Sequence, residues 1–103
     1  MDSWPTSREV EKPKPETTIW KFELPTHGKV TIEVPGPVTL LAVGVQENSP
    51  VVWAEVHPDY GLRKRVLEVR LTGAKKYLQR GAYIGTFQLR GPYVGHVFVL
   101  GEL

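Results

Sequence analysis

Residues 18–34 read TIWKFELPTHGKVTIEV, and they contain two alternating segments separated by a turn. In residues 18–24 and again in residues 29–34, apolar side chains occupy every second position. This period of two is typical of a strand with one buried face. Pro25, His27 and Gly28 provide the turn between the segments. The stretch therefore predicts two strands, with these residues facing inward: Trp20, Phe22, Leu24, Val30, Ile32 and Val34.

The rest of the chain continues this pattern, with turn residues about every ten positions. Five further strands are expected at residues 38–46, 51–56, 65–71, 83–89 and 93–100. Seven short strands with regular turns predict one all-β antiparallel sandwich or small barrel. The strand at 38–46 is apolar on both faces, so we expect it at the centre of the fold, covered on both sides. Residues 72–81 are expected to form a loop, with a single helical turn as the alternative.

The first sixteen residues differ from the rest, because Pro, Lys and Glu dominate them. Such a segment cannot bury enough apolar surface to offset the entropy of ordering. We therefore expect a flexible tail at residues 1–16 and a single all-β domain at residues 17–103, since the length suits one core. The alternative is an arm that orders on a partner through Trp4 and Val10.

Composition excludes several classes of protein. The chain has no Cys, which removes thiolate chemistry, disulfides and Cys-based zinc sites. Its longest apolar stretch, residues 38–45, is far shorter than a membrane helix of about 20 residues. No secretory signal precedes the strands. We expect an intracellular protein that binds no membrane and no cofactor, and the scarcity of Asn and Met beside nine Pro is typical of heat-adapted proteins.

The titratable residues do not predict a catalytic centre or a metal site. His27, His57 and His96 fall on three different elements, whereas zinc needs convergent ligands. His27 and His57 are expected in solvated turns, and His96 is expected to be a hydrogen-bonded strand histidine. Serines lie only in the tail or in a turn, without the nucleophile-elbow motif. Four strand carboxylates that could act in glycoside hydrolysis are expected to face solvent: Glu23, Glu33, Glu55 and Glu68. We therefore predict a protein that is not an enzyme.

Charge is distributed unevenly along the chain. Between His57 and Arg90 there are eight Lys or Arg residues and only two acidic ones, Asp59 and Glu68. If the loops on either side of residues 65–71 meet, they form an anion-binding patch with tyrosines for stacking. The alternative is a solvated basic rim. The candidate binding residues are Tyr60, Arg63, Lys64, Arg65, Arg70, Lys75, Lys76, Tyr77 and Arg80, with Arg90 nearby.

Several segments over residues 18–100 resemble a family of small tailed-bacteriophage proteins of unknown function. The resemblance rests on WKFEL at 20–24, residues 40–46, WAEV at 53–56, Thr72-Gly73, YIGTFQ at 83–88 and HVF at 96–98. It implies a phage origin and a compact β domain, and it carries no site residue over. The basic loop around Lys75 and the long tail depart from the pattern.

Three functions follow as hypotheses. The first is a phage accessory protein in the host cytoplasm that sequesters a host protein or a phosphorylated small molecule such as a signalling nucleotide, for host takeover or defence evasion. The second is a virion component such as a capsid decoration protein, and the third is a nucleic-acid binder whose affinity falls with salt. Because sheet edges must be paired, covered or charged, we also expect a homo-oligomer formed through a strand edge.

Overall fold

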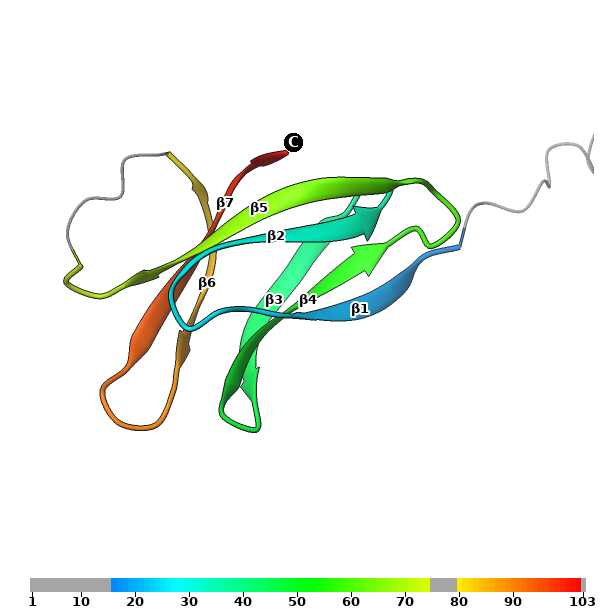
Figure 1. The fold of residues 1–103 in the computed structure, drawn as a ribbon. Coiled ribbons are helices and arrows are strands. Elements are labelled where there is room, and N and C mark those ends of the chain that lie inside the picture. Colours follow the sequence, from blue (N-terminus) through cyan, green and yellow to red (C-terminus); the bar gives the residue numbers. More distant parts are fainter. Residues whose placement is uncertain (1–15, 75–79, 103) are drawn as a thin grey trace, which may run out of the picture.

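Seven strands make up the regular structure of the described residues, and they form two antiparallel sheets (Figure 1). The computed structural model describes residues 16–74 and 80–102. The prediction of an all-β fold with seven strands is confirmed, whereas residues 1–15 of the predicted tail lie outside the described residues. In chain order the strands are β1 (Thr18–Glu23), β2 (Gly28–Pro35), β3 (Thr39–Gln46), β4 (Ser49–Val56), β5 (Leu62–Leu71), β6 (Ala82–Gln88) and β7 (Val94–Glu102).

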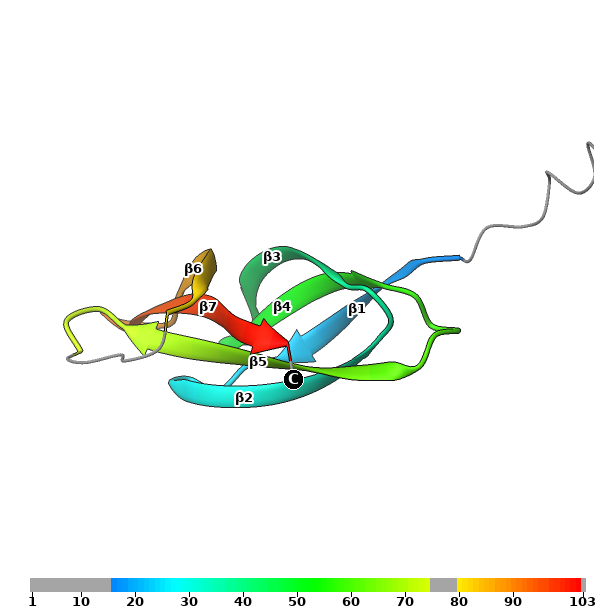
Figure 2. The same ribbon diagram turned by 90° about the horizontal axis from the view of Figure 1, so that it is seen from above.

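The two sheets differ in size. The three-stranded sheet has the order β1-β4-β3, and the four-stranded sheet has the order β2-β5-β7-β6. Every pair of neighbouring strands is antiparallel. Seen from above, β3 and β4 lie on one side of the molecule and β2 and β5 on the other (Figure 2). Of the two predicted architectures, the structure is therefore a sandwich of two sheets.

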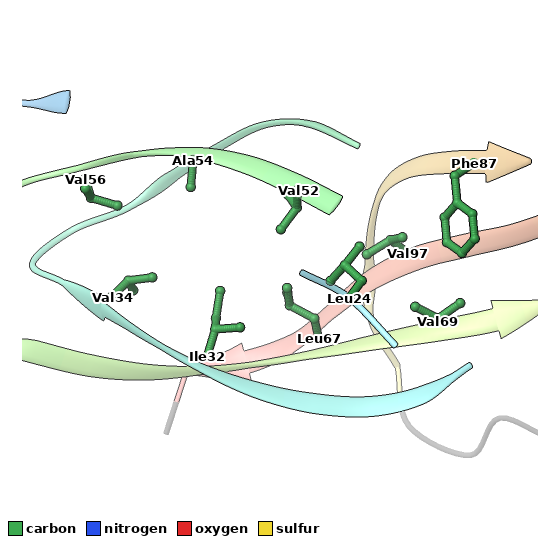
Figure 3. Close-up of a cluster of buried hydrophobic side chains, with 10 residues drawn as sticks. All are labelled: Leu24, Ile32, Val34, Val52, Ala54, Val56, Leu67, Val69, Phe87 and Val97. Carbon is green, nitrogen blue, oxygen red and sulfur yellow. The ribbon is translucent and has the colours of Figure 1, made fainter. Parts of the chain in front are cut away.

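The core lies between the inner faces of the two sheets. Val52 and Val56 of β4 point toward Val34, Leu67 and their neighbours on the four-stranded sheet (Figure 3), and these four side chains are fully buried. Each buried Val or Leu side chain contributes roughly 1.5–3 kcal/mol. The complete buried cluster is Leu24, Ile32, Val34, Val52, Ala54, Val56, Leu67, Val69, Phe87 and Val97.

The prediction that residues 38–46 form a central strand covered on both sides is wrong. This segment forms β3, which lies at the edge of its sheet, and β4 is the middle strand. Leu41 is 48% exposed and Val45 is 38% exposed. A β-bulge between Leu40 and Ala42 explains the pattern, because the extra residue changes which alternate positions face inward. Leu40 before the bulge and Val43 after it both pack against the core. Inward-facing apolar residues therefore occur at both even and odd positions of this segment.

Trp20 also differs from expectation. It belongs to the inner face of β1, since its cross-strand partner is the buried Ala54. Its side chain is nevertheless 38% exposed, because β1 is an edge strand. The alternation predicted inward orientation correctly here, but it could not predict how far the opposite sheet extends over that face.

Candidate functional site

The basic residues predicted as one patch fall into two groups in the structure. The strand β5 begins at Leu62, three residues earlier than predicted, so Arg63 to Arg65 belong to the strand. With a rise of about 3.3 Å per residue, Arg63 and Arg70 are separated by about 23 Å along β5. The loop 57–61 and residues 72–74, which follow β5, lie at opposite ends of the strand (Figure 1). The cations at the two ends of β5 therefore do not converge, and Lys75, Lys76 and Tyr77 lie outside the described residues.

The group at the start of β5 is divided further by the pleat of the strand. Arg63 and Arg65 pair with Val34 and Ile32, which face the core. Lys64 lies between them in the strand and therefore belongs to the opposite, outer face of the sheet. Arg65 is half-buried, and its Nε is buried without a hydrogen-bond partner in the described part of the chain. These three cations consequently do not present one common surface.

Tyr60 serves mainly to close its loop. Its ring centroid lies 5.0 Å from that of His57, and its backbone N–H donates to the His57 carbonyl at 3.0 Å. Gly36 sits beneath it, where a Cβ would come within 2.7 Å of Tyr60 Cβ. The expectation that His57 is solvated is wrong, because the ring is half-buried and its Nδ1 is buried without a partner among the described residues. His27 is exposed, as expected.

The structure instead brings together a hydrogen-bonded chain of four side chains on the outer face of the four-stranded sheet. Thr72 Oγ1 lies 2.7 Å from His96 Nε2, and Thr86 Oγ1 lies 3.0 Å from His96 Nδ1. Thr86 Oγ1 also lies 2.6 Å from the Tyr83 hydroxyl oxygen. We call Thr72, His96, Thr86 and Tyr83 the outer-face chain. It confirms the expectation that His96 is a hydrogen-bonded strand histidine.

Strand register places these residues side by side. His96 of β7 lies directly opposite Thr86 of β6, and Thr72 follows the end of β5. Tyr83 and Thr86 are three residues apart, so simple alternation would place them on opposite faces. A bulge at Ile84, between the paired residues Tyr83 and Gly85, restores both to the outer face. This bulge is why sequence reasoning missed Tyr83 and Thr86.

A second group of side chains lies beside the outer-face chain. Arg70 pairs with His96 across β5 and β7, and its Nε donates to Glu68 Oε1 at 2.8 Å. The guanidinium carbon lies 4.3 Å from the centroid of the Phe98 ring, which is a cation–π arrangement. Tyr83 meets the same ring edge-on at a centroid distance of 5.7 Å. Arg70, a residue of the predicted patch, thus directly adjoins this arrangement.

Glu68 corrects another expectation. The alternation along β5 does place Glu68 on the outer face of the sheet, but the residue is only 7% exposed. Arg70 and the cross-strand neighbours Lys29 and Phe98 surround it. Glu23 and Glu33 are exposed as expected, while Glu55 is half-buried.

The outer-face chain can be hydrogen-bonded in two opposite directions. A neutral imidazole donates through one nitrogen and accepts through the other. If Thr72 donates to His96, the protons are directed toward Tyr83, whose hydroxyl is then free to donate outward. In the reverse direction Thr72 has the free proton. In both directions the exposed hydroxyl groups at the two ends, those of Thr72 and Tyr83, keep hydrogen-bonding capacity for a partner, and Tyr83 is 59% exposed. The surface can therefore bind a partner that offers both an acceptor and a donor.

The described residues do not bring metal-ligating side chains together. They contain no group of three or more His, Cys, Asp or Glu placed to hold a metal ion. A cavity of about 400 Å³ lies on the other sheet, near the β3–β4 turn. Its lining residues are Lys21, Glu23, Gln46, Glu47, Ser49 and Val51. In the part of the chain that the structure describes, no helix is long and apolar enough to cross a membrane.

Comparison with known proteins gives one match. Residues 15–102 match a family described as a domain of unknown function, DUF7352. No curated protein and no solved structure matches this chain significantly.

Proposed function

We propose a binding function without catalysis for this chain, which belongs to the DUF7352 family of domains of unknown function. The observation that carries the proposal is the outer-face chain. Both ring nitrogens of His96 are held by threonine hydroxyls, at 2.7 and 3.0 Å. A general base needs a ring nitrogen directed at the proton it removes. A ring held at both nitrogens is better suited to presenting a fixed pattern of donors and acceptors to a partner.

The character of the surface favours a protein partner. Tyr and Arg are enriched among the residues that dominate binding energy at protein interfaces, and Tyr83 and Arg70 lie together here. A small ligand generally needs a concave pocket that buries most of its surface. Neither residue lines the cavity on the other sheet. A host protein therefore fits this surface better than a phosphorylated small molecule does.

The resemblance to tailed-phage proteins supports a phage origin for this function. We infer that the protein acts in the host cytoplasm as an accessory factor that occupies a host protein during infection or defence evasion. A virion location and nucleic-acid binding are the alternatives. Detection of the chain in purified particles would indicate the virion. Affinity for a labelled oligonucleotide that falls steeply with added salt would indicate nucleic acid.

The test compares variants that change single groups of the outer face. Tagged full-length chain captures partners from host extract, and the affinity for the captured protein is measured by biolayer interferometry. Tyr83→Ala is expected to weaken binding by roughly thirtyfold, the effect of a hot-spot residue. Thr86→Val, which keeps the side-chain shape, is expected to weaken it less. Unchanged affinity in both variants would reject the outer face as the binding surface.

The basic residues provide a matched comparison. In the variant Arg63→Ala/Lys64→Ala/Lys75→Ala/Lys76→Ala, four cations are removed while the outer-face chain is left intact. Full binding by this variant together with loss in Tyr83→Ala supports the proposal. The opposite result would assign binding to the basic residues predicted from the sequence.

A further inference from the structure

The strand β1 has one unpaired edge. It pairs with β4 on one side, and no strand of the described residues pairs with it on the other. Two large apolar side chains lie on this strand with considerable exposure, Ile19 at 59% and Trp20 at 38%. Unpaired edges present backbone N–H and C=O groups that readily accept another strand.

The other three edge strands lack this combination. Both β3 and β6 contain a bulge, at Leu41 and Ile84, and bulges protect edges against further pairing. The strand β2 has no bulge, but its exposed outward side chains, Lys29, Thr31 and Glu33, are polar, and its large inward ones at Ile32 and Val34 are buried. Among the described edge strands, β1 alone joins a regular edge to exposed large apolar side chains.

The hydrogen bonds of β1 determine which of its backbone groups face outward. Leu24 N–H donates to the Pro50 carbonyl at 3.0 Å. Leu24 and Pro50, which lie opposite each other, are therefore a hydrogen-bonded pair of the ladder between β1 and β4. Hydrogen-bonded and non-hydrogen-bonded pairs alternate along an antiparallel ladder. The amide groups of Ile19, Lys21 and Glu23 are therefore directed away from β4, toward the free edge.

We propose that a second copy of this chain pairs antiparallel with this edge, with Phe22 on the twofold axis. In this register Lys21 lies opposite Glu23 of the second copy, and the symmetric pair repeats the contact. The backbone amide groups of both residues point toward the free edge, as pairing with a second strand requires. Moving the register by one step would place Lys21 against Lys21 of the second copy, and directly opposed like charges destabilise a sheet. Charge complementarity thus selects both the occupant and the register.

Pairing also covers the exposed apolar residues on the inner face. Trp20 would lie opposite Leu24 of the second copy, and the two Phe22 rings would meet at the axis. Trp20 and Phe22 already pack together, with ring centroids 6.2 Å apart. Lys21 would have to leave its exposed hydrogen bond to Gln46, which is a small loss because water replaces it. The result is one continuous six-stranded sheet, β3-β4-β1-β1-β4-β3.

Sedimentation velocity of the full-length chain tests this proposal. A pair of six-residue strands is at the small end of specific interfaces, so we expect a monomer–dimer equilibrium over about 1–200 µM protein. Lys21→Glu and Glu23→Lys each convert two ion pairs into two like-charge pairs. Each is expected to raise the dimer dissociation constant by about tenfold or more.

The double variant Lys21→Glu/Glu23→Lys is the decisive measurement. It exchanges the charges and restores complementarity, so the dimer should return. Glu33→Lys on the β2 edge is the control, and it should leave the equilibrium unchanged. The proposal fails if the wild-type chain is monomeric throughout the range, if the double variant stays monomeric, or if Glu33→Lys dissociates the dimer. Circular dichroism of each variant shows whether the fold is intact, so that loss of the dimer is not mistaken for unfolding.

Discussion

Gly95 is where the packing of the four-stranded sheet can be tested most sharply. It lies on β7 directly opposite Phe87 of β6, one residue before His96. The Phe87 ring folds over the glycine, and a Cβ at position 95 would come within 2.8 Å of Phe87 Cε2 and 2.9 Å of Val69 Cγ1. Because Phe87 is only 3% exposed and Val69 is fully buried, neither side chain has room to move. We expect Gly95→Ala to be destabilising for purely steric reasons.

The size of the effect follows from two opposing contributions. Overpacking of a core by one methyl group costs about 1–3 kcal/mol, and several close contacts place this case at the upper end. Replacing Gly by Ala restricts the unfolded chain, which returns about 0.4–1 kcal/mol. The net destabilisation is then about 2 kcal/mol, which lowers the Tm of a domain this size by roughly 8–16 °C. Thermal unfolding followed by circular dichroism measures this shift.

Gly61→Ala is the matched control, because a Cβ added at this position would have no other atom within 4 Å. It should melt at or slightly above the wild-type temperature. A Gly95→Ala chain that melts within about 2 °C of wild type would refute the reasoning, since the expected shift is several times larger. The cause is checked by repeating Gly95→Ala in a Phe87→Leu background. If the clash with the ring is responsible, the penalty there is smaller, as expected for residues in contact.

Three further predictions concern the core, the outer face and a turn. Leu67→Ala, at a fully buried position, should lower the urea-derived free energy of unfolding by about 3 kcal/mol, and a loss below about 1 kcal/mol would contradict the assigned core. Thr86→Val should lower the free energy of unfolding by about 1 kcal/mol and change the ring ¹⁵N chemical shifts of His96. Unchanged shifts would argue against the hydrogen bond between Thr86 and His96. Glu47→Asn should raise the free energy of unfolding by about 0.5 kcal/mol, because Glu47 has a φ of 51° in a two-residue hairpin turn, where Asn is favoured. A Tm below that of the wild type would contradict this.

Strand content was predictable from the sequence because alternation reports burial of one face directly. Residues 29–34 alternate regularly, and the side chains of Ile32 and Val34 are buried as predicted. The same rule failed at β3, where one inserted residue at Leu41 made an edge strand look like a central one. Alternation identifies which side chains share a face only while the pairing register is continuous. A bulge is a feature of two strands together, so one segment of sequence does not reveal it.

The candidate site was less predictable for the same physical reason. Charge density along the chain singled out Arg63 and Arg70 as neighbours of one patch, but a ten-residue strand holds them far apart. Conversely, Thr72 and His96 are distant in sequence and meet through the pairing of β5 with β7. Of the predicted basic residues on β5, Arg70 lies beside the outer-face chain, whereas Lys64 shares that face but lies near the start of the strand. Strand order determines which polar residues meet, and the sequence pattern leaves that order open.

The two proposed surfaces belong to different sheets, and this separation has a functional consequence. The β1 edge extends the three-stranded sheet, whereas the outer-face chain lies on the four-stranded sheet. Pairing through β1 therefore leaves Tyr83 and His96 accessible in both copies. A dimer would present two identical binding surfaces related by a twofold axis, and a partner that is itself symmetric or immobilised would gain affinity without any new contact. Each proposal also remains testable alone, because Lys21→Glu changes the association state without touching the outer face, and Tyr83→Ala changes the outer face without touching the β1 edge.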